Sequence, residues 1–178
     1  MKTKEDAVKI SNIMKDIGKL AGIETVCVIT NMDEPIGKSV GNSLEIIEAV
    51  EALKGNMTDD IKEIILTIGS LIIKLAGKNS SIEENKQMML ENISNGKAYS
   101  KFLELVENQG GDVSYIKDTC KFEKAKYILP VISEKNGFVE RLDGESVGEI
   151  SVYLGAGRMK KEDEIDHSAR DSAREENS

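Results

Sequence analysis

Cysteine, proline and aromatic residues are scarce in this 178-residue chain. It contains no Trp, two Cys and two Pro, and aromatic residues make up only 4% of it. Cys27 and Cys120 are too few for a disulfide framework and lack metal-site spacing, which predicts a reducing, cytoplasmic location. Apolar runs such as 71–73 end far short of the ~20 residues that a membrane span needs. The N-terminus also lacks the apolar core of a secretory signal, so neither a membrane protein nor a secreted mini-domain is predicted.

Positive charge is also in deficit. The formal net charge is −8, and the Lys and Arg residues are scattered along the chain rather than clustered. A polyanion would be repelled by such a surface, so a nucleic-acid partner is not predicted. With 39% apolar and 31% charged residues, the composition is that of a globular protein. The length is sufficient for one domain, or two small ones, around a sizeable core.

The first 30 residues predict a helix followed by a strand. Thr3 can cap the helix with Asp6 three residues later, and apolar side chains then recur at helical spacing until Gly22. Residues 25–30 are mostly β-branched with little alternation, which is typical of a strand buried on both faces of a parallel sheet. The helix would then be the crossover helix of an α/β unit.

Four further helices are predicted, each closed by a glycine. They span 43–54, 58–76, 80–95 and 97–108, and Gly55, Gly77, Gly96 and Gly110 end them. A single parallel strand among so many helices needs neighbouring strands to pair its backbone groups. The predicted fold class is therefore α/β, with residues 1–118 forming part of a central α/β domain.

A second module is predicted from the change in pattern that begins at Lys126. Residues 127–132 and 137–142 are expected to form two strands, and Asp143 can cap a helix after them. The glycine-rich turn 155–158 is more typical of a helix C-cap than of an anion site. We therefore expect residues 119–168 to be the beginning of an α+β C-terminal domain. Residues 169–178 have no large apolar side chain and are expected to be a polar, disordered tail.

The loop after the predicted strand is the segment richest in candidate chemistry. It leaves the edge at which open α/β sheets bind ligands, Gly37 and Gly41 permit turns, and Asn42 can cap the next helix. No phosphate-binding glycine motif is present, so an ordinary connection is favoured over a ligand loop. Glu48 can fold back under the loop and offer a carboxylate to a hard cation, but a solvated helix-face role is favoured. The single histidine, His167, is assigned no role.

Two segments together resemble one enzyme family. Residues 29–46, ITNMDEPIGKSVGNSLEI, with Glu48 and Ala49 after them, resemble the strand, loop and helix of the pyrimidine nucleoside and thymidine phosphorylases. The later runs GFV (137–139), LGAGR (154–158) and KEDEID (161–166) resemble the opening of the C-terminal domain in that family. The resemblance covers about residues 1–168.

The resemblance implies a pentosyltransferase that catalyses reversible phosphorolysis of pyrimidine nucleosides to the base and a pentose 1-phosphate. The family's Lys-His-Ser-Thr-Gly-Gly phosphate loop, and the Arg, Ser and Lys that grip the base, precede the position matched by Met1. Hence no catalytic or substrate-binding residue is assigned, and the isolated chain is expected to be an inactive internal part. The family homodimer forms largely through N-terminal helices that also precede this position. After Ser168 the sequence departs from the family pattern, and this departure is what a frameshift or a broken reading frame would produce.

Some family members hold a potassium ion, and the resemblance implies where this chain would contribute to it. The corresponding ligands are the main-chain carbonyls of Ile36 and Ser39 and the carboxylate of Glu48. Ser39 replaces an Ala of several members, which matters little for a main-chain ligand. Two alternatives to the phosphorylase remain. One is a non-catalytic α/β module that binds another subunit through its open strand edge, and the other is part of a related nucleotide phosphorylase.

Overall fold

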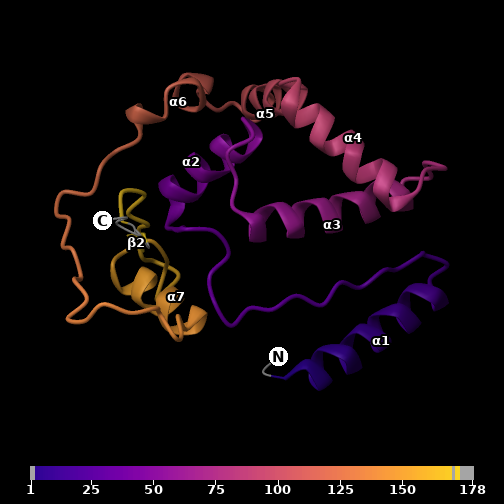
Figure 1. The fold of residues 1–178 in the computed structure, drawn as a ribbon, viewed down its shortest axis with the longest axis horizontal. Helices are drawn as coiled ribbons and strands as arrows, with labels where there is room; N and C mark the ends of the chain where they lie inside the picture. The colour runs from indigo at the N-terminus through magenta and orange to yellow at the C-terminus, as the bar shows by residue number, and fades with distance from the viewer. Residues whose placement is uncertain (1–2, 170, 173–178) are drawn as a thin grey trace. The chain divides into compact units, whose positions relative to one another are not determined.

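The computed structural model describes residues 3–169 and 171–172 (Figure 1). The chain divides into two compact units. One unit comprises Met1–Asn31 with Glu63–Leu90, and the other Met32–Lys62 with Glu91–Ser178. The elements are α1 (Lys4–Leu20), β1 (Ser39–Val40), α2 (Asn42–Leu53), α3 (Asp59–Leu75), α4 (Ile82–Ser94), α5 (Lys97–Asn108), α6 (Val113–Lys117), the 3-10 helix η1 (Thr119–Lys121), α7 (Gly144–Tyr153) and β2 (Asp171–Ser172). The units divide the chain differently from the boundary expected at residues 118 and 119, which stays a prediction.

The helices confirm the sequence predictions to within two residues at each end. Thr3 caps α1, its Oγ1 accepting the Asp6 N–H at 3.1 Å. Each of α2 to α5 lies inside its expected range or within one residue of it. The glycines that close α1 to α5 all have positive φ: Gly22, Gly55, Gly77, Gly96 and Gly110. Helix ends are thus set by local sequence, because glycine adopts this conformation without strain.

A buried asparagine joins α3 to α4 in the first unit. Asn85 is fully buried, and its Nδ2 donates to the Ser70 carbonyl at 3.1 Å. Its Oδ1 accepts a short hydrogen bond from the Ser80 hydroxyl. Both polar ends of the amide therefore have partners, as a buried side chain of this kind requires.

Residues 25–30 do not form the predicted strand. They lack regular secondary structure and run back beside α1 (Figure 1). Gly18 of α1 is buried, and a Cβ there would collide with Thr25, while the Cys27 thiol lies 3.6 Å from the Ser11 carbonyl. Residues 25–30 therefore pack closely against α1. A β-strand also needs a neighbouring strand for its backbone hydrogen bonds, and within the described ranges the structure places no strand beside this segment.

The two strands expected in the second module are also absent from residues 127–132 and 137–142. Val131 and Phe138 are fully exposed there, so no neighbouring layer covers them. The helix after them is confirmed as α7, with Asp143 accepting the Ser146 N–H at 2.9 Å. Gly155 follows with φ 103°, which confirms the C-cap prediction for the glycine-rich turn. The α/β class is therefore not confirmed, because β1 and β2 form the only sheet in the described residues.

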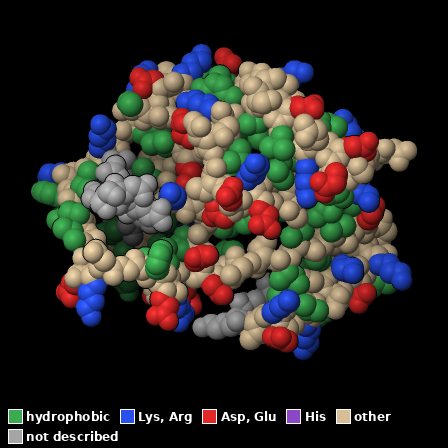
Figure 2. Space-filling view, in the orientation of Figure 1, with side chains coloured by type: hydrophobic (Ala, Val, Ile, Leu, Met, Phe, Trp, Pro, Cys, Tyr) green, Lys and Arg blue, Asp and Glu red, His purple; other side chains and the backbone are tan. Residues whose placement is uncertain are grey.

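The buried apolar core is small. Among the described residues, the buried apolar side chains are those of Val50, Ala52, Ile116 and Ala169. Many large aliphatic side chains remain at the surface, and apolar atoms are visible over the face in Figure 2. The sizeable core expected from chain length is thus not found in the described ranges. No described helix combines the length and apolar content that crossing a bilayer requires.

The expected polar tail is described only in part. Ala169 is buried, and Asp171–Ser172 form β2, which pairs antiparallel with β1. In this register Ser39 lies opposite Ser172, and Val40 lies opposite Asp171. The remaining tail positions, 170 and 173–178, lie outside the described residues, so the predicted disorder there stays a prediction.

Candidate functional site

Two carboxylates hold successive backbone amides of the loop before α2. Glu48 on α2 accepts the Lys38 N–H at 2.8 Å through Oε1. Asp60, in the first turn of α3, accepts the Gly37 N–H at 2.7 Å through Oδ2. Hydrogen bonds from a neutral N–H to a charged acceptor are among the stronger ones in proteins. The loop conformation at residues 36–39 is therefore fixed from two helices at once.

Gly37 is required by this arrangement. Its φ is 74°, in the left-handed region that favours glycine. A Cβ at this position would approach Glu48 Oε2 at 2.5 Å and Ile61 Cδ1 at 2.8 Å. The second oxygen of Glu48 therefore lies against the glycine, and the whole carboxylate faces the loop.

The end of the loop meets later parts of the chain. Gly41, with φ 118°, is the N-cap of α2, and its N–H donates to the Glu45 carboxylate at 3.0 Å. The prediction that Asn42 caps the helix is wrong, because Asn42 is its first residue and its Nδ2 donates to the Ala156 carbonyl at 2.9 Å. Ser43 Oγ donates to the His167 carbonyl at 2.6 Å. Because the N-cap is a glycine, no side-chain oxygen caps the first N–H groups of α2, and Glu45 instead binds the N–H of the N-cap residue itself.

The three residues predicted as cation ligands all lie in the segment Met32–Lys62, which belongs to the second compact unit. Ile36 is 39% exposed in the loop, Ser39 is half-buried in β1, and Glu48 is half-buried on α2. The structure brings Glu48 under the loop, so the interpretation of Glu48 as a solvated helix-face residue is wrong. Its role as a ligand stays a prediction.

The donor set suits a hard cation of low charge rather than a transition metal. Main-chain carbonyls and one carboxylate are oxygen ligands, and no His or Cys takes part. In residues 3–169 and 171–172 there is no cluster of three or more His, Cys, Asp or Glu side chains arranged to hold a metal. Oxygen ligands from the backbone would therefore have to supply most of any cation shell in this loop.

Asp60 is the residue of this site that sequence reasoning missed. Its carboxylate accepts the Gly37 N–H, and this hydrogen bond holds the pKa of Asp60 below its usual value. The ionised form is therefore favoured at neutral pH. A usable signal was the pair of acidic residues, Asp59 and Asp60, at the start of a helix predicted to follow the loop helix.

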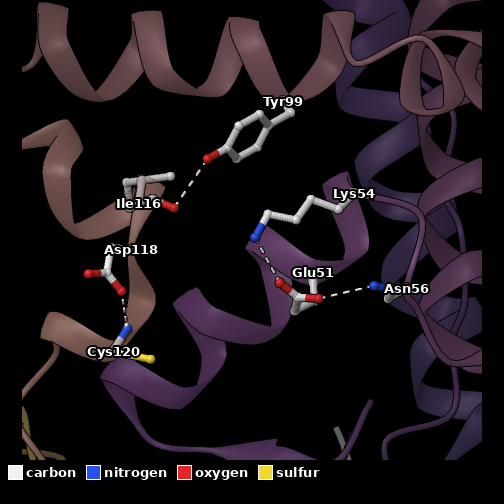
Figure 3. Close-up of polar contacts among 7 residues, drawn as sticks. All are labelled: Glu51, Lys54, Asn56, Tyr99, Ile116, Asp118 and Cys120. Carbon is white, nitrogen blue, oxygen red and sulfur yellow. Dashed lines mark hydrogen bonds and ion pairs between the residues drawn. The ribbon is translucent and has the colours of Figure 1, made fainter.

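A second polar cluster joins α2 to α5 and α6 (Figure 3). Glu51 pairs with Lys54 at 2.9 Å and accepts from Asn56 at 3.1 Å, and these contacts lower the pKa of Glu51. The Lys54 ammonium lies 5.8 Å from the centre of the Tyr99 ring, and the Tyr99 hydroxyl donates to the Ile116 carbonyl at 3.2 Å. Each polar group has a structural partner, so this cluster stabilises helix packing and is not the candidate site.

Comparison with known proteins gives a match to one family model and matches to curated proteins. The family model described as the pyrimidine nucleoside phosphorylase C-terminal domain matches residues 138–169. The pyrimidine-nucleoside phosphorylase of Bacillus subtilis (strain 168) is 40% identical over 166 residues, which are 93% of this chain and 38% of that protein. The protein of the same name from Staphylococcus aureus (strain USA300) is 39% identical with the same coverage.

The family-model match includes α7 and its C-cap, and the matches to the two curated proteins span nearly all of the chain, so both kinds of comparison point to one family. The chain spans 38% of the length of these curated relatives. Within that span, the chain is similar to the pyrimidine-nucleoside phosphorylases, and the matched family model carries the same name.

Proposed function

We propose that this chain serves the reversible phosphorolysis of pyrimidine nucleosides. The observation that carries the proposal is the 40% identity to the Bacillus subtilis pyrimidine-nucleoside phosphorylase over 93% of the chain. The loop geometry supports it, because the glutamate that the resemblance assigns to this loop is hydrogen-bonded to it. The Glu48 carboxylate therefore contacts the loop directly instead of only facing solvent from the helix.

In the proposed reaction a phosphate oxygen forms a bond to the anomeric carbon of the nucleoside. The bond from that carbon to the base nitrogen breaks, and its electron pair leaves with the base. The products are a free pyrimidine and a pentose 1-phosphate. Such reactions depend on holding phosphate and nucleoside in line while charge on the base is stabilised. The family's phosphate-loop and base-gripping motifs are not found in these 178 residues, so we assign this chain a supporting role.

That supporting role includes part of a potassium site. The carbonyl oxygens of Ile36 and Ser39 and the carboxylate of Glu48 would hold the ion, and a bound cation would neutralise Glu48 and stiffen the loop. The Glu48 carboxylate already faces this loop, with Oε1 accepting from Lys38 and Oε2 beside Gly37. The residues therefore fit an oxygen-rich cation site in the chemistry of their donors.

The substrates of the proposal are a pyrimidine nucleoside and phosphate. It includes a cytoplasmic location, which the two free cysteines support, since an oxidising compartment favours paired ones. Nucleic acid and membrane are not among the proposed partners. The proposal also includes the homodimer of the family, for a full-length enzyme that contains this sequence.

A chimera tests the function. The segment of the Bacillus subtilis relative that matches this chain is replaced by the residues of this chain, and uracil release from uridine is measured with and without phosphate. Phosphate-dependent release is expected from the chimera. The 178-residue chain alone is expected to release none, because lost positioning of the reactants costs many orders of magnitude in rate. A folded chimera that releases no uracil in the presence of phosphate would contradict the proposal. Uracil release by the purified 178-residue chain, with none from a mock preparation, would contradict its supporting role.

A further inference from the structure

The direction of the Ile36 carbonyl is linked to the hydrogen bond made by the next residue. The described residues include no cis peptide bond, and a trans peptide places its C=O and N–H on opposite sides. The Gly37 N–H points to Asp60 Oδ2 at 2.7 Å. The Ile36 carbonyl, which belongs to the same peptide group, therefore points away from Asp60.

Glu48 fixes the following peptide in the same way. Its Oε1 accepts the Lys38 N–H at 2.8 Å, so two adjacent peptide planes are each held by one carboxylate. Gly37 lies between the planes with φ 74°, and without a Cβ it can turn more freely than any other residue. Because Gly37 is flexible, the Ile36 carbonyl before it keeps one direction only if other side chains restrain the peptide group.

We propose that Asp60 is a positioning residue that aims the Ile36 carbonyl by holding the Gly37 amide. The inference rests on the proposed function, since it gives Asp60 a role toward the cation loop of that function. Asp60 acts through the peptide group and does not contact the cation. Its acceptor oxygen, rather than its charge, is the essential feature.

The helix start offers a matched control. Asp59 and Asp60 are both exposed acidic residues in the first turn of α3, where a negative charge favours the helix dipole. A role in helix stability alone would make the two residues equivalent. A positioning role requires the acceptor at Asp60 only, so loop measurements on variants of the two positions separate the explanations.

The first experiment measures amide hydrogen exchange in the full chain without added potassium. Asp60→Ala is expected to speed exchange at Gly37 by about tenfold, the effect of losing a hydrogen bond to a charged acceptor. Asp60→Asn keeps an acceptor oxygen and is expected to stay within about threefold of the parent chain. Asp59→Ala is expected to leave Gly37 unchanged. Unchanged exchange in Asp60→Ala would overturn the proposal, as would equal acceleration in the Asp59→Ala control.

The second experiment follows the same amides while potassium chloride replaces tetramethylammonium chloride at constant ionic strength. Potassium is expected to slow exchange in the parent chain, and Asp60→Ala to need about tenfold more potassium for the same slowing. Asp60→Asn is expected to restore most of the response. Loss of the response in both Asp60 variants would indicate a charge effect and overturn positioning. A parent chain without any potassium response would instead contradict the cation part of the proposed function, while Gly37 exchange still decides the role of Asp60.

Discussion

Helix α2 and the extended segment 127–132 are both rich in aliphatic residues, yet they bury them very differently. Val50 of α2 is fully buried, whereas Val131 is fully exposed. A helix satisfies its own backbone hydrogen bonds and needs a neighbour only for one face, while a strand needs a partner for its backbone as well. Apolar composition alone therefore does not decide which segments of this chain become ordered layers. The availability of a backbone partner does.

The largest expected effect compares these two valines directly. Val50→Ala is expected to lower the free energy of unfolding by about 2.5 kcal/mol, because it leaves a cavity in a small core. Val131→Ala is expected to change it by less than about 0.5 kcal/mol. Urea denaturation of both variants measures the difference. Equal destabilisation would show that residues 127–132 are packed in solution and would break the comparison.

The second effect tests whether the helices are joined by specific polar contacts. Asn85→Ala leaves the Ser70 carbonyl and the Ser80 hydroxyl without their partner inside the α3 and α4 pair, and should cost about 2 kcal/mol. Asn108→Ala changes the same residue type at the exposed end of α5, with an expected change below about 0.5 kcal/mol. Thermal unfolding checks both. A neutral Asn85→Ala variant would mean that apolar packing alone holds the pair.

The third effect compares two glycines of similar backbone conformation. Gly22 and Gly37 have φ of 70° and 74°, but a Cβ meets nothing within 4 Å at the first and the Glu48 carboxylate at the second. Gly22→Ala is expected to cost about 1 kcal/mol from backbone strain. Gly37→Ala should cost about 1 kcal/mol more, because Glu48 must move and lose its bond to Lys38. Denaturation gives the two values, and equal losses would show that the loop is not crowded.

The smallest effect concerns the start of α7, directly after the exposed segment. The Ser146 hydroxyl and N–H, with Arg141, lower the pKa of Asp143 to about 2. The cap therefore stabilises the helix above the unfolded carboxyl pKa near 4, and this contribution is lost as pH falls toward 2. NMR titration should show the Ser146 amide following the Asp143 carboxyl at this low pKa. Asp143→Asn should abolish that inflection, and a carboxyl that titrates near 4 would contradict the cap.

Local chemistry accounts for what the sequence could predict. Thr3, Asp143 and the closing glycines act within three or four residues, so helix ends are visible in the sequence. The partners that a strand at 25–30 would need are distant, and no pattern within the segment reveals whether they exist. The same limit applies to the site. Glu48 was a candidate through family resemblance, whereas the contact of Asp60 with Gly37 spans 23 positions and needs two helices to be placed first.

The contacts at the start of α2 have a consequence for the order in which the protein matures. Asn42 and Ser43 bond to carbonyls 114 and 124 positions further along the chain. During synthesis the ribosome must therefore add more than 100 residues after the loop before these contacts can close. Closing so long a segment is entropically costly and slow relative to helix formation. On this basis, helices α2 to α5 are expected to form before the start of α2 gains the contacts of Asn42 and Ser43 with the end of the chain.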